Sequence, residues 1–237
     1  MRGEYDAELQ QVTRLLVAMA DAVRAAMSQA TASLLAGNRE LAEQVVAQDA
    51  LIDNSHDRVE ERVYGLLARR APVALDLRLL VAALHIAADL ERMGDLAANV
   101  AKVGLRRHPA PAVAASLRDI IARMAAVADR IAAKISAVLA APDMAPGRRP
   151  ADGRPAESIA VDAATLGLDD DEMDRLHEGL FGVLLGAAWR DGVEAAVDGA
   201  LLGRCYERFA DHAVNAGRRV YFLVTGRLPQ KIGDLGN

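Results

Sequence analysis

The chain alternates long stretches of helix-like periodicity with short breaks rich in glycine or proline. From residue 8 to residue 35, apolar residues recur at steps of three and four, which is the period of one buried face of an α-helix. A Gly-Asn pair at 37–38 ends this pattern, and Asn38 is placed to cap the next helix, which extends to about residue 70. Pro72 breaks the pattern again, and a third helix extends to about residue 107. The first 108 residues therefore predict three long antiparallel helices.

The second half of the chain repeats this organisation. A helix is predicted from about residue 112 to 140, followed by a proline-rich loop at 142–156 and by helices at about 157–190 and 193–225. Gly226 and Pro229 end the last helix. The pattern predicts an all-α protein of two tandem, pseudo-symmetric three-helix bundles. The two domains expected from it are residues 1–108 and 112–237, the second containing the loop at 142–156.

Composition agrees with a helical core and excludes several classes of protein. Hydrophobic residues make up 52% of the chain and aromatic residues only 3%, which favours packed helices over a β-sandwich. The net charge of −5 argues against a general nucleic-acid binder. A single cysteine excludes an internal disulfide and suits a reducing cytoplasm. The N-terminus lacks the apolar region of a signal peptide, and no run approaches the ~18 apolar residues of a spanning helix. We therefore expect a soluble, cytosolic protein.

A polar motif occurs twice in the predicted third and sixth helices. The pattern Glu-Arg-x-x-Asp-x-Ala-x-Asn begins at Glu91 and recurs 116 positions later at Glu207. Upstream, "DALIDNSH" at 49–56 corresponds to "DDEMDRLH" at 170–177, with Asp at the first and fifth positions and His at the eighth. Both motifs fall in corresponding helices of the two halves. An internal duplication explains these matches better than chance does.

The duplicated motifs place carboxylates in pairs four residues apart, and such residues lie on the same side of an α-helix. If the two helices of each half are antiparallel neighbours, four carboxylates converge on one patch. Their repulsion would raise their pKa values unless cations bind. Oxygen ligands suit hard or borderline cations, so we predict a metal site in each half. The first set is Asp49, Asp53, Glu91 and Asp95, and the second is Asp170, Asp174, Glu207 and Asp211.

Three other duplicated pairs accompany the acids. The histidines follow an aspartate at the third position, an arrangement similar to the acid-x-x-His ligands of di-iron bundles, or they are surface histidines. The arginines are expected to form structural salt bridges. The asparagines either donate hydrogen bonds to the ligands or pack between helices, and the acid pairs themselves could be solvated helix faces. These pairs are His56 and His177, Arg92 and Arg208, and Asn99 and Asn215.

On these motifs the chain resembles the PhoU family, the accessory and regulatory proteins of high-affinity phosphate transport. That family has two similar three-helix bundles with Glu/Asp-x-x-x-Asp motifs on adjacent helices, in the order and spacing of the four acid pairs. The segments "PVALDLR" at 72–78 and "VYFLVTG" at 220–226 resemble family segments as well. The chain departs from the family in three ways. Asp76 and Arg78 have Gly192 and Glu194 as counterparts, the loop at 142–156 looks like an insertion, and the histidines lie outside the family pattern.

The resemblance implies a non-enzymatic regulator of phosphate uptake and phosphate-starvation signalling. It would act between the ATPase subunit of a phosphate ABC transporter and a sensor histidine kinase. The carboxylates would hold multinuclear clusters of iron or zinc, with manganese or magnesium as further candidates. We also expect a homodimer that is at most peripheral to the membrane and binds no nucleic acid.

Two alternatives remain open on the sequence. A ferritin-like di-iron oxidase would need Asp53–His56 and Asp174–His177 to replace the usual Glu-x-x-His ligands. A metal-free helical adaptor would follow if the acid pairs are solvated.

Overall fold

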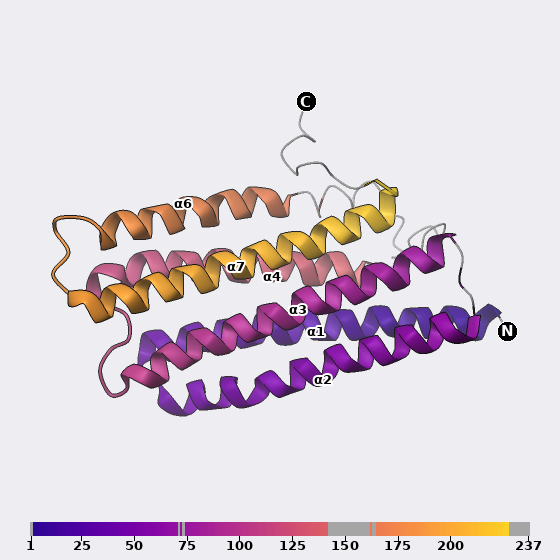
Figure 1. The fold of residues 1–237 in the computed structure, drawn as a ribbon, viewed down its shortest axis with the longest axis horizontal. Helices are drawn as coiled ribbons and strands as arrows, with labels where there is room; N and C mark the ends of the chain where they lie inside the picture. Colours follow the sequence, from indigo (N-terminus) through magenta and orange to yellow (C-terminus); the bar gives the residue numbers. More distant parts are fainter. Residues whose placement is uncertain (1, 71, 73, 142–161, 163–164, 228–237) are drawn as a thin grey trace.

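The structure, a computed structural model, describes residues 2–70, 72, 74–141, 162 and 165–227. In these residues the regular elements are all helices, which confirms the all-α class (Figure 1). The loop predicted at 142–156 lies outside the described residues. The helices are α1 (Arg2–Ala36), α2 (Arg39–Arg70), α3 (Ala74–Arg107), the short 3₁₀ helix η1 (Ala115–Leu117), α4 (Arg118–Ala140), α6 (Leu166–Leu184) and α7 (Gly192–Thr225).

The helices form two similar three-helix bundles that lie side by side. Helices α1, α2 and α3 pack against one another, as do α4, α6 and α7. Contacts between α1 and α4 and between α3 and α7 join the two bundles. In Figure 1 the nearer layer contains α2, α3, α7 and α6, with α1 and α4 behind it. A pseudo-twofold axis between α3 and α7 therefore relates α1 to α4, α2 to α6 and α3 to α7, as the duplicated motifs predict.

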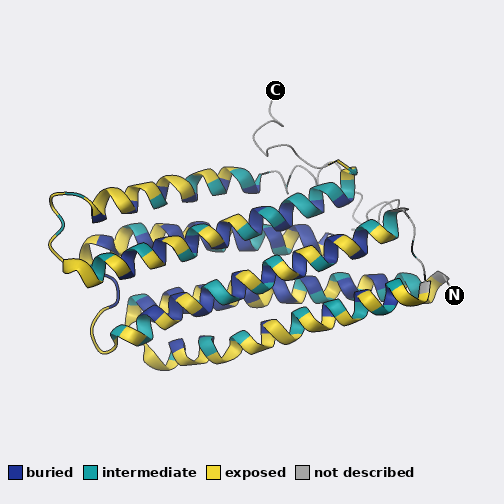
Figure 2. Ribbon diagram, in the orientation of Figure 1, coloured by how far each residue is buried: buried dark blue, intermediate teal, exposed yellow. Residues whose placement is uncertain are grey.

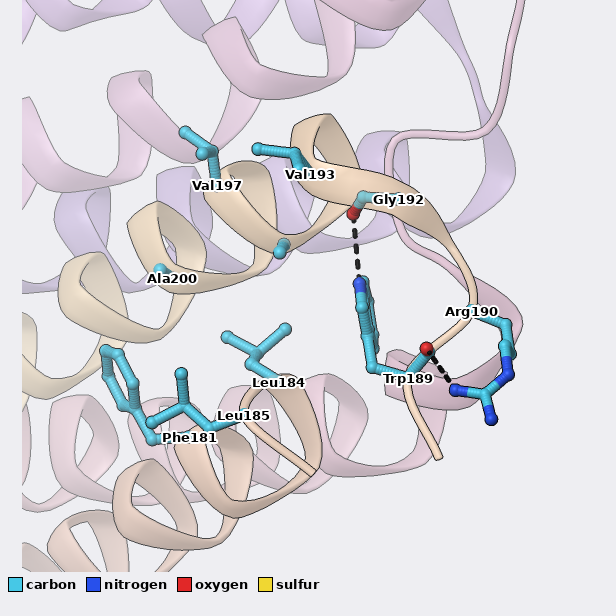
Figure 3. Close-up of a pocket in the computed structure, with 10 residues that line it drawn as sticks. Phe181, Leu184, Leu185, Trp189, Arg190, Gly192, Val193, Val197 and Ala200 are labelled. Carbon is cyan, nitrogen blue, oxygen red and sulfur yellow. Dashed lines mark hydrogen bonds between the residues drawn. The ribbon is translucent and has the colours of Figure 1, made fainter. Parts of the chain in front are cut away.

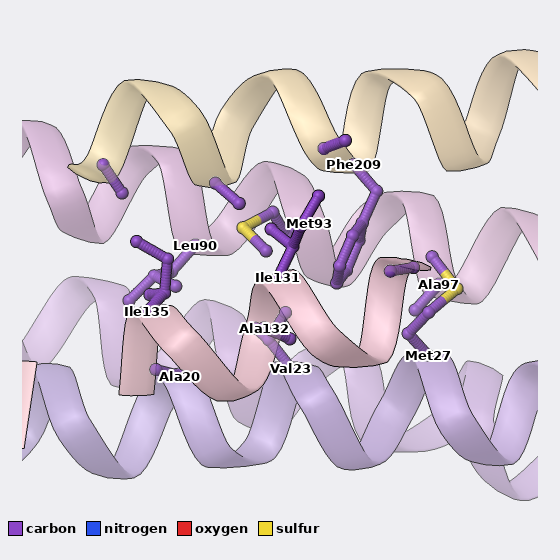
Figure 4. Packing of buried hydrophobic residues seen from close by; sticks show 14 of the residues in the cluster. Ala20, Val23, Met27, Leu90, Met93, Ala97, Ile131, Ala132, Ile135 and Phe209 are labelled. Atoms are coloured by element: carbon purple, nitrogen blue, oxygen red, sulfur yellow. The ribbon is translucent and has the colours of Figure 1, made fainter. Parts of the chain in front are cut away.

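The two bundles share one hydrophobic core. The apolar faces of the helices turn inward, and the exposed positions lie outside (Figure 2). In Figure 4, Val23 of α1, Met93 of α3, Ile131 of α4 and Phe209 of α7 lie within one packed cluster. All four side chains are at most 1% exposed. Because residues of both halves complete this cluster, neither half encloses the core by itself.

Polar contacts also join the halves. Arg24 of α1 binds Asp129 of α4 through Nε at 2.7 Å and Nη2 at 3.0 Å. Tyr206 of α7 and Thr31 of α1 have their hydroxyl oxygens 2.7 Å apart, and Thr31 donates to the Met27 carbonyl. The Tyr206 hydroxyl therefore donates to Thr31, and this buried pair is satisfied without water.

Most helix ends agree with the sequence, including Thr225 at the end of α7. The exceptions lie in the second half, where α4 begins at Arg118 rather than near residue 112 and α6 ends early. The Asn38 side chain accepts a hydrogen bond from the Leu41 amide at 3.0 Å, which confirms the predicted cap of α2. The helix predicted to end near residue 190 instead ends at Leu184. The Gly186 amide bonds to Val183, only three residues back, and the Trp189 amide then bonds to Gly186. The prediction was wrong here because Gly186 permits this tighter turn, in which a Cβ atom would lie 3.0 Å from the Gly182 carbonyl oxygen.

Candidate functional site

Helices α2 and α3 bring the four acids of the first set together. Asp49 and Asp53 lie on α2, and Glu91 and Asp95 lie on the facing side of α3. Burial, followed by the charges of Asp53 and Asp95, raises the pKa of Asp49. Burial also raises the pKa of Glu91, with Asp95 adding to the shift and Arg92 opposing it. The acids are therefore close enough to repel one another, as the spacing of the motifs predicts.

Gly94 brings α3 close to α2 at this point. A Cβ atom at Gly94 would lie 3.0 Å from the Ile52 side chain and 3.4 Å from Asp49 Oδ1. That oxygen is buried and accepts no hydrogen bond from the described residues. A buried carboxylate oxygen without a donor is costly. Asp49 Oδ1 is therefore a suitable ligand atom for a cation.

The second set forms the corresponding site between α6 and α7. Burial, followed by the charges of Asp174 and Asp211, raises the pKa of Asp170 to about 6. Burial raises the pKa of Asp174 as well, and the charges of Asp211 and Asp171 add to it. Asp170 and Asp174 therefore resist ionisation in a carboxylate cluster to which the charge of Asp211 contributes.

The two sites differ in how arginine binds their glutamates. In the second site, Arg204 Nη1 lies 2.7 Å and 2.6 Å from the two carboxylate oxygens of Glu207. In the first site, Arg92 lies 3.1 Å from Asp95 and 3.5 Å from Glu91. The salt bridges expected for Arg92 are thus present, whereas its counterpart Arg208 makes none within the described residues. Arg204 was not identified from the sequence, because its counterpart in the first half is Ala88.

The two histidines lie beside the acids. His56 Nδ1 is 3.6 Å from Asp57, and the charge of His56 opposes the rise in the pKa of Glu91. The ring of His177 meets the Phe181 ring edge-on, with 5.1 Å between centroids. Its Nε2 atom is buried and makes no hydrogen bond to the described residues. The His177 ring therefore has a nitrogen atom beside the second site that makes no hydrogen bond to the described residues.

A duplicated pair of cationic residues, Lys102 and Arg218, was not predicted from the sequence. Lys102 opposes the rise in the pKa of Asp49, and Arg218 opposes that of Asp170. These residues are also 116 positions apart, so the repeat extends beyond the asparagines. Asn215 Oδ1 accepts a hydrogen bond from Arg218 at 3.3 Å, whereas Asn99 is exposed. Each site therefore has, besides Arg92 or Arg204, a duplicated cation two turns after the aspartate of its motif on α3 or α7.

The carboxylate oxygens of both sites are of a kind that binds cations, but in this structure the side chains are not grouped around a common point. As they stand, no three Asp, Glu, His or Cys side chains of the described residues are grouped so that they could hold a metal ion. Binding would require the carboxylates to change rotamer, which side chains near the surface do readily. The clustered carboxylates and the unbonded oxygen of Asp49 favour such a change.

In the described chain, no helix is long and apolar enough to cross a membrane.

Comparisons with known proteins agree with this architecture. The family model described as the PhoU domain matches residues 16–103. The chain is 41% identical to the phosphate-specific transport system accessory protein PhoU homolog 2 of Mycobacterium tuberculosis, over 97% of this chain and 100% of that protein. It is 40% identical to the PhoU homolog 1 of Mycobacterium leprae, over 97% of this chain and 96% of that protein.

Two crystal structures share the fold. The phosphate transport system regulatory protein PhoU from Streptococcus pneumoniae superposes with a TM-score of 0.77, covering 95% of this chain and 99% of that one. PhoU from Pseudomonas aeruginosa superposes with a TM-score of 0.78, covering 94% and 100%. Sequence identity is 24% in both cases, so these matches bear on the fold.

Proposed function

Because this chain belongs to the PhoU family, we propose that it is a non-enzymatic regulator of phosphate uptake and of phosphate-starvation signalling. Its partners in this proposal are the ATPase subunit of a phosphate ABC transporter and a phosphate-sensing histidine kinase. It would act in the cytoplasm as a homodimer. The observation that carries the proposal is the pair of carboxylate sites on a fold shared with phosphate-transport accessory proteins.

The proposal gives the carboxylates the role of holding metal ions. The first site would use Asp49, Asp53, Glu91 and Asp95, and the second would use Asp170, Asp174, Glu207 and Asp211. Bound cations would neutralise carboxylates that otherwise repel one another across two helices. Iron and zinc are the first candidates, followed by manganese and magnesium. The helix pairs α2–α3 and α6–α7 would then be stabilised by metal, because binding energy adds to folding energy.

The ferritin-like oxidase is supported less well by the arrangement of the helices. Its metal pair would need the Asp53–His56 and Asp174–His177 motifs in one four-helix core. Those motifs lie on α2 and α6, which are separated by α3 and α7 (Figure 1). Each histidine is therefore beside its own carboxylate set rather than beside the other.

Metal analysis of a double variant tests the metal sites. Protein purified without chelator is expected to contain bound metal, and Glu91→Ala/Asp95→Ala should lose the share bound to the first site. The matched control is Asp57→Ala/Glu61→Ala, which removes an exposed acid pair of the same spacing on α2. Equal metal content in the site variant and the control would show that these acids do not bind metal. A metal-free wild type would favour the adaptor.

A deletion strain tests the regulatory role. We expect phosphate-starvation genes to be expressed in rich phosphate when the gene is deleted, and to be repressed again when it is restored. An oxidase would instead consume oxygen with ferrous iron and leave this expression unchanged. In a strain without a second copy of the gene, normal phosphate control after deletion would contradict the proposal.

A further inference from the structure

Both ends of the molecule expose apolar side chains. The first apolar patch consists of Tyr64 at the end of α2 and Leu77 and Val81 at the start of α3. These side chains are 54%, 42% and 42% exposed. Solvent-exposed apolar clusters of this kind mark interaction sites more often than isolated exposed side chains do.

The opposite end has a larger second apolar patch: Phe181, Leu185, Trp189, Val193 and Val197. Leu185, Val193 and Val197 are 83%, 79% and 53% exposed. The patch lines a groove of about 600 Å³ between the end of α6 and the start of α7. Figure 3 shows Phe181 and Leu185 on the α6 side, and Val193 and Val197 on α7. Trp189 Nε1 donates to the Gly192 carbonyl at 3.0 Å, which fixes the indole ring at the end of the groove.

The two patches occupy equivalent positions in the internal repeat. Asp170 of α6 lies 121 positions after its counterpart Asp49 of α2. The same separation makes Leu185 the counterpart of Tyr64. The separation of 116 residues that relates α3 to α7 pairs Leu77 with Val193 and Val81 with Val197. All three exposed residues of the first patch thus have exposed apolar counterparts in the second. Among the other large apolar side chains of the described chain, only Leu51, Leu168, Val183 and Leu201 are exposed.

The fold places these patches where one partner can reach both. Helices α3 and α7 each pack against three neighbours, so their remaining sides face the solvent. Both helices lie in the nearer layer of Figure 1, and they run in opposite directions. The patches therefore lie at the two ends of one broad face, related by the pseudo-twofold axis. Arg92 and Arg204, which bind the carboxylates of the two sites, are exposed between them.

We propose that the two apolar patches together form a docking surface for a twofold-symmetric partner that presents one amphipathic helix from each of its two subunits. Side chains at steps of four on α3 and α7 match the apolar stripe of such a helix. A symmetric dimer presents its helices in the same twofold relation as the patches. This inference rests on the proposed function, in which the transporter's ATPase subunit is the partner, and it requires two copies of that subunit to bind one chain.

Binding to the purified ATPase subunit tests the inference. The variants are Val81→Asp, Val197→Asp and both together, with Leu51→Asp as the matched control, since Leu51 is 64% exposed on α2 outside both patches. Far-UV circular dichroism and thermal unfolding establish that each variant is folded. Each single variant should bind at least about tenfold more weakly, because losing one contact removes the gain from linking the two. The double variant should bind about a hundredfold more weakly, because losses at two separate positions add in free energy. Light scattering should give one chain per two ATPase subunits.

Four results would overturn the inference. Unchanged binding of the double variant relative to Leu51→Asp would show that the patches are not the docking surface. Loss of binding in one single variant with none in the other would exclude a two-point contact. If the double variant has a lower mass than the wild type when each is measured without the ATPase subunit, the patches join copies of this chain instead. If the wild type does not bind the ATPase subunit, the transporter part of the proposed function fails together with the inference.

Discussion

Asp170 shows at the scale of one residue how the carboxylate sites affect stability. Its pKa of about 6 lies above the ordinary value of 3.8, mainly because of burial. Between these values the folded chain binds more protons than the unfolded chain does, so stability decreases as the pH rises from about 4 to 6. Above pH 6 the ionised carboxylate remains a destabilising group. A bound cation would remove this cost.

We predict that Asp170→Asn stabilises the chelator-treated protein at pH 7. The gain should be about 1–2 kcal/mol, allowing for partial solvent screening of the carboxylate. The difference from the wild type should shrink as the pH falls to 4, because the wild-type carboxyl becomes protonated. Urea unfolding of both proteins at pH 7 and at pH 4 measures this difference in stability.

The neighbouring Asp171 provides the control for this experiment. It is exposed, and its charge changes the pKa of Asp170 less than burial, Asp174, Asp211 or Arg218 does. Asp171→Asn should therefore change stability by less than Asp170→Asn does. If the two variants behave alike, the cost does not arise at Asp170.

At the scale of an element, glycine determines how closely α7 approaches α6. A Cβ atom at Gly203 would lie 2.3 Å from Leu180 Cδ2 and 3.1 Å from the His177 ring. A Cβ atom at Gly182, also in a helix, would meet nothing within 4 Å. The same substitution therefore has opposite consequences at the two positions.

We predict that Gly203→Ala destabilises the protein by about 1–3 kcal/mol, because crowding outweighs the gain in helix propensity. Gly182→Ala should instead stabilise it by up to about 1 kcal/mol. Chemical denaturation of both variants measures the difference. Equal stabilisation of the two variants would mean that α7 moves away from α6 without cost.

The sequence predicted the helices and the closeness of the carboxylates within each set, because both depend on local spacing, whereas metal binding at these sets stays a prediction. Asp49 and Asp53 share a side of α2 whatever the tertiary fold, and the repeat indicates which helices correspond. Spacing does not show which apolar face is covered, however. Val193 and Val197 have the periodicity of core residues, yet both are exposed. Arg204 lies three residues before Glu207, a spacing that favours a salt bridge, but it lies outside the duplicated motif because its counterpart is Ala88.

At the scale of the whole molecule, the shared core makes the two halves depend on each other. Met93 of α3 and Phe209 of α7 are fully buried in one cluster to which both halves contribute (Figure 4). Arg24–Asp129 and Tyr206–Thr31 add polar contacts between the halves. Unfolding of one half would expose the core face of the other.

We therefore predict a single cooperative unfolding transition by calorimetry. Met93→Ala and Phe209→Ala should each cost about 2–5 kcal/mol, and each should lower the temperature of that one transition. Two transitions, with each variant moving only one of them, would show that the halves unfold independently.

The contact between Asp89 and His212 bears on the ancestry of the chain. His212 Nδ1 lies 3.0 Å from Asp89 Oδ1, across the boundary between α3 and α7. The repeat places Cys205 opposite Asp89 and Leu96 opposite His212. An ancestral dimer of identical three-helix subunits would have had this contact twice or not at all. A contact made once requires two halves that mutate separately, so the difference between the halves at these positions arose after the duplication, whether the second contact was lost or the first was gained.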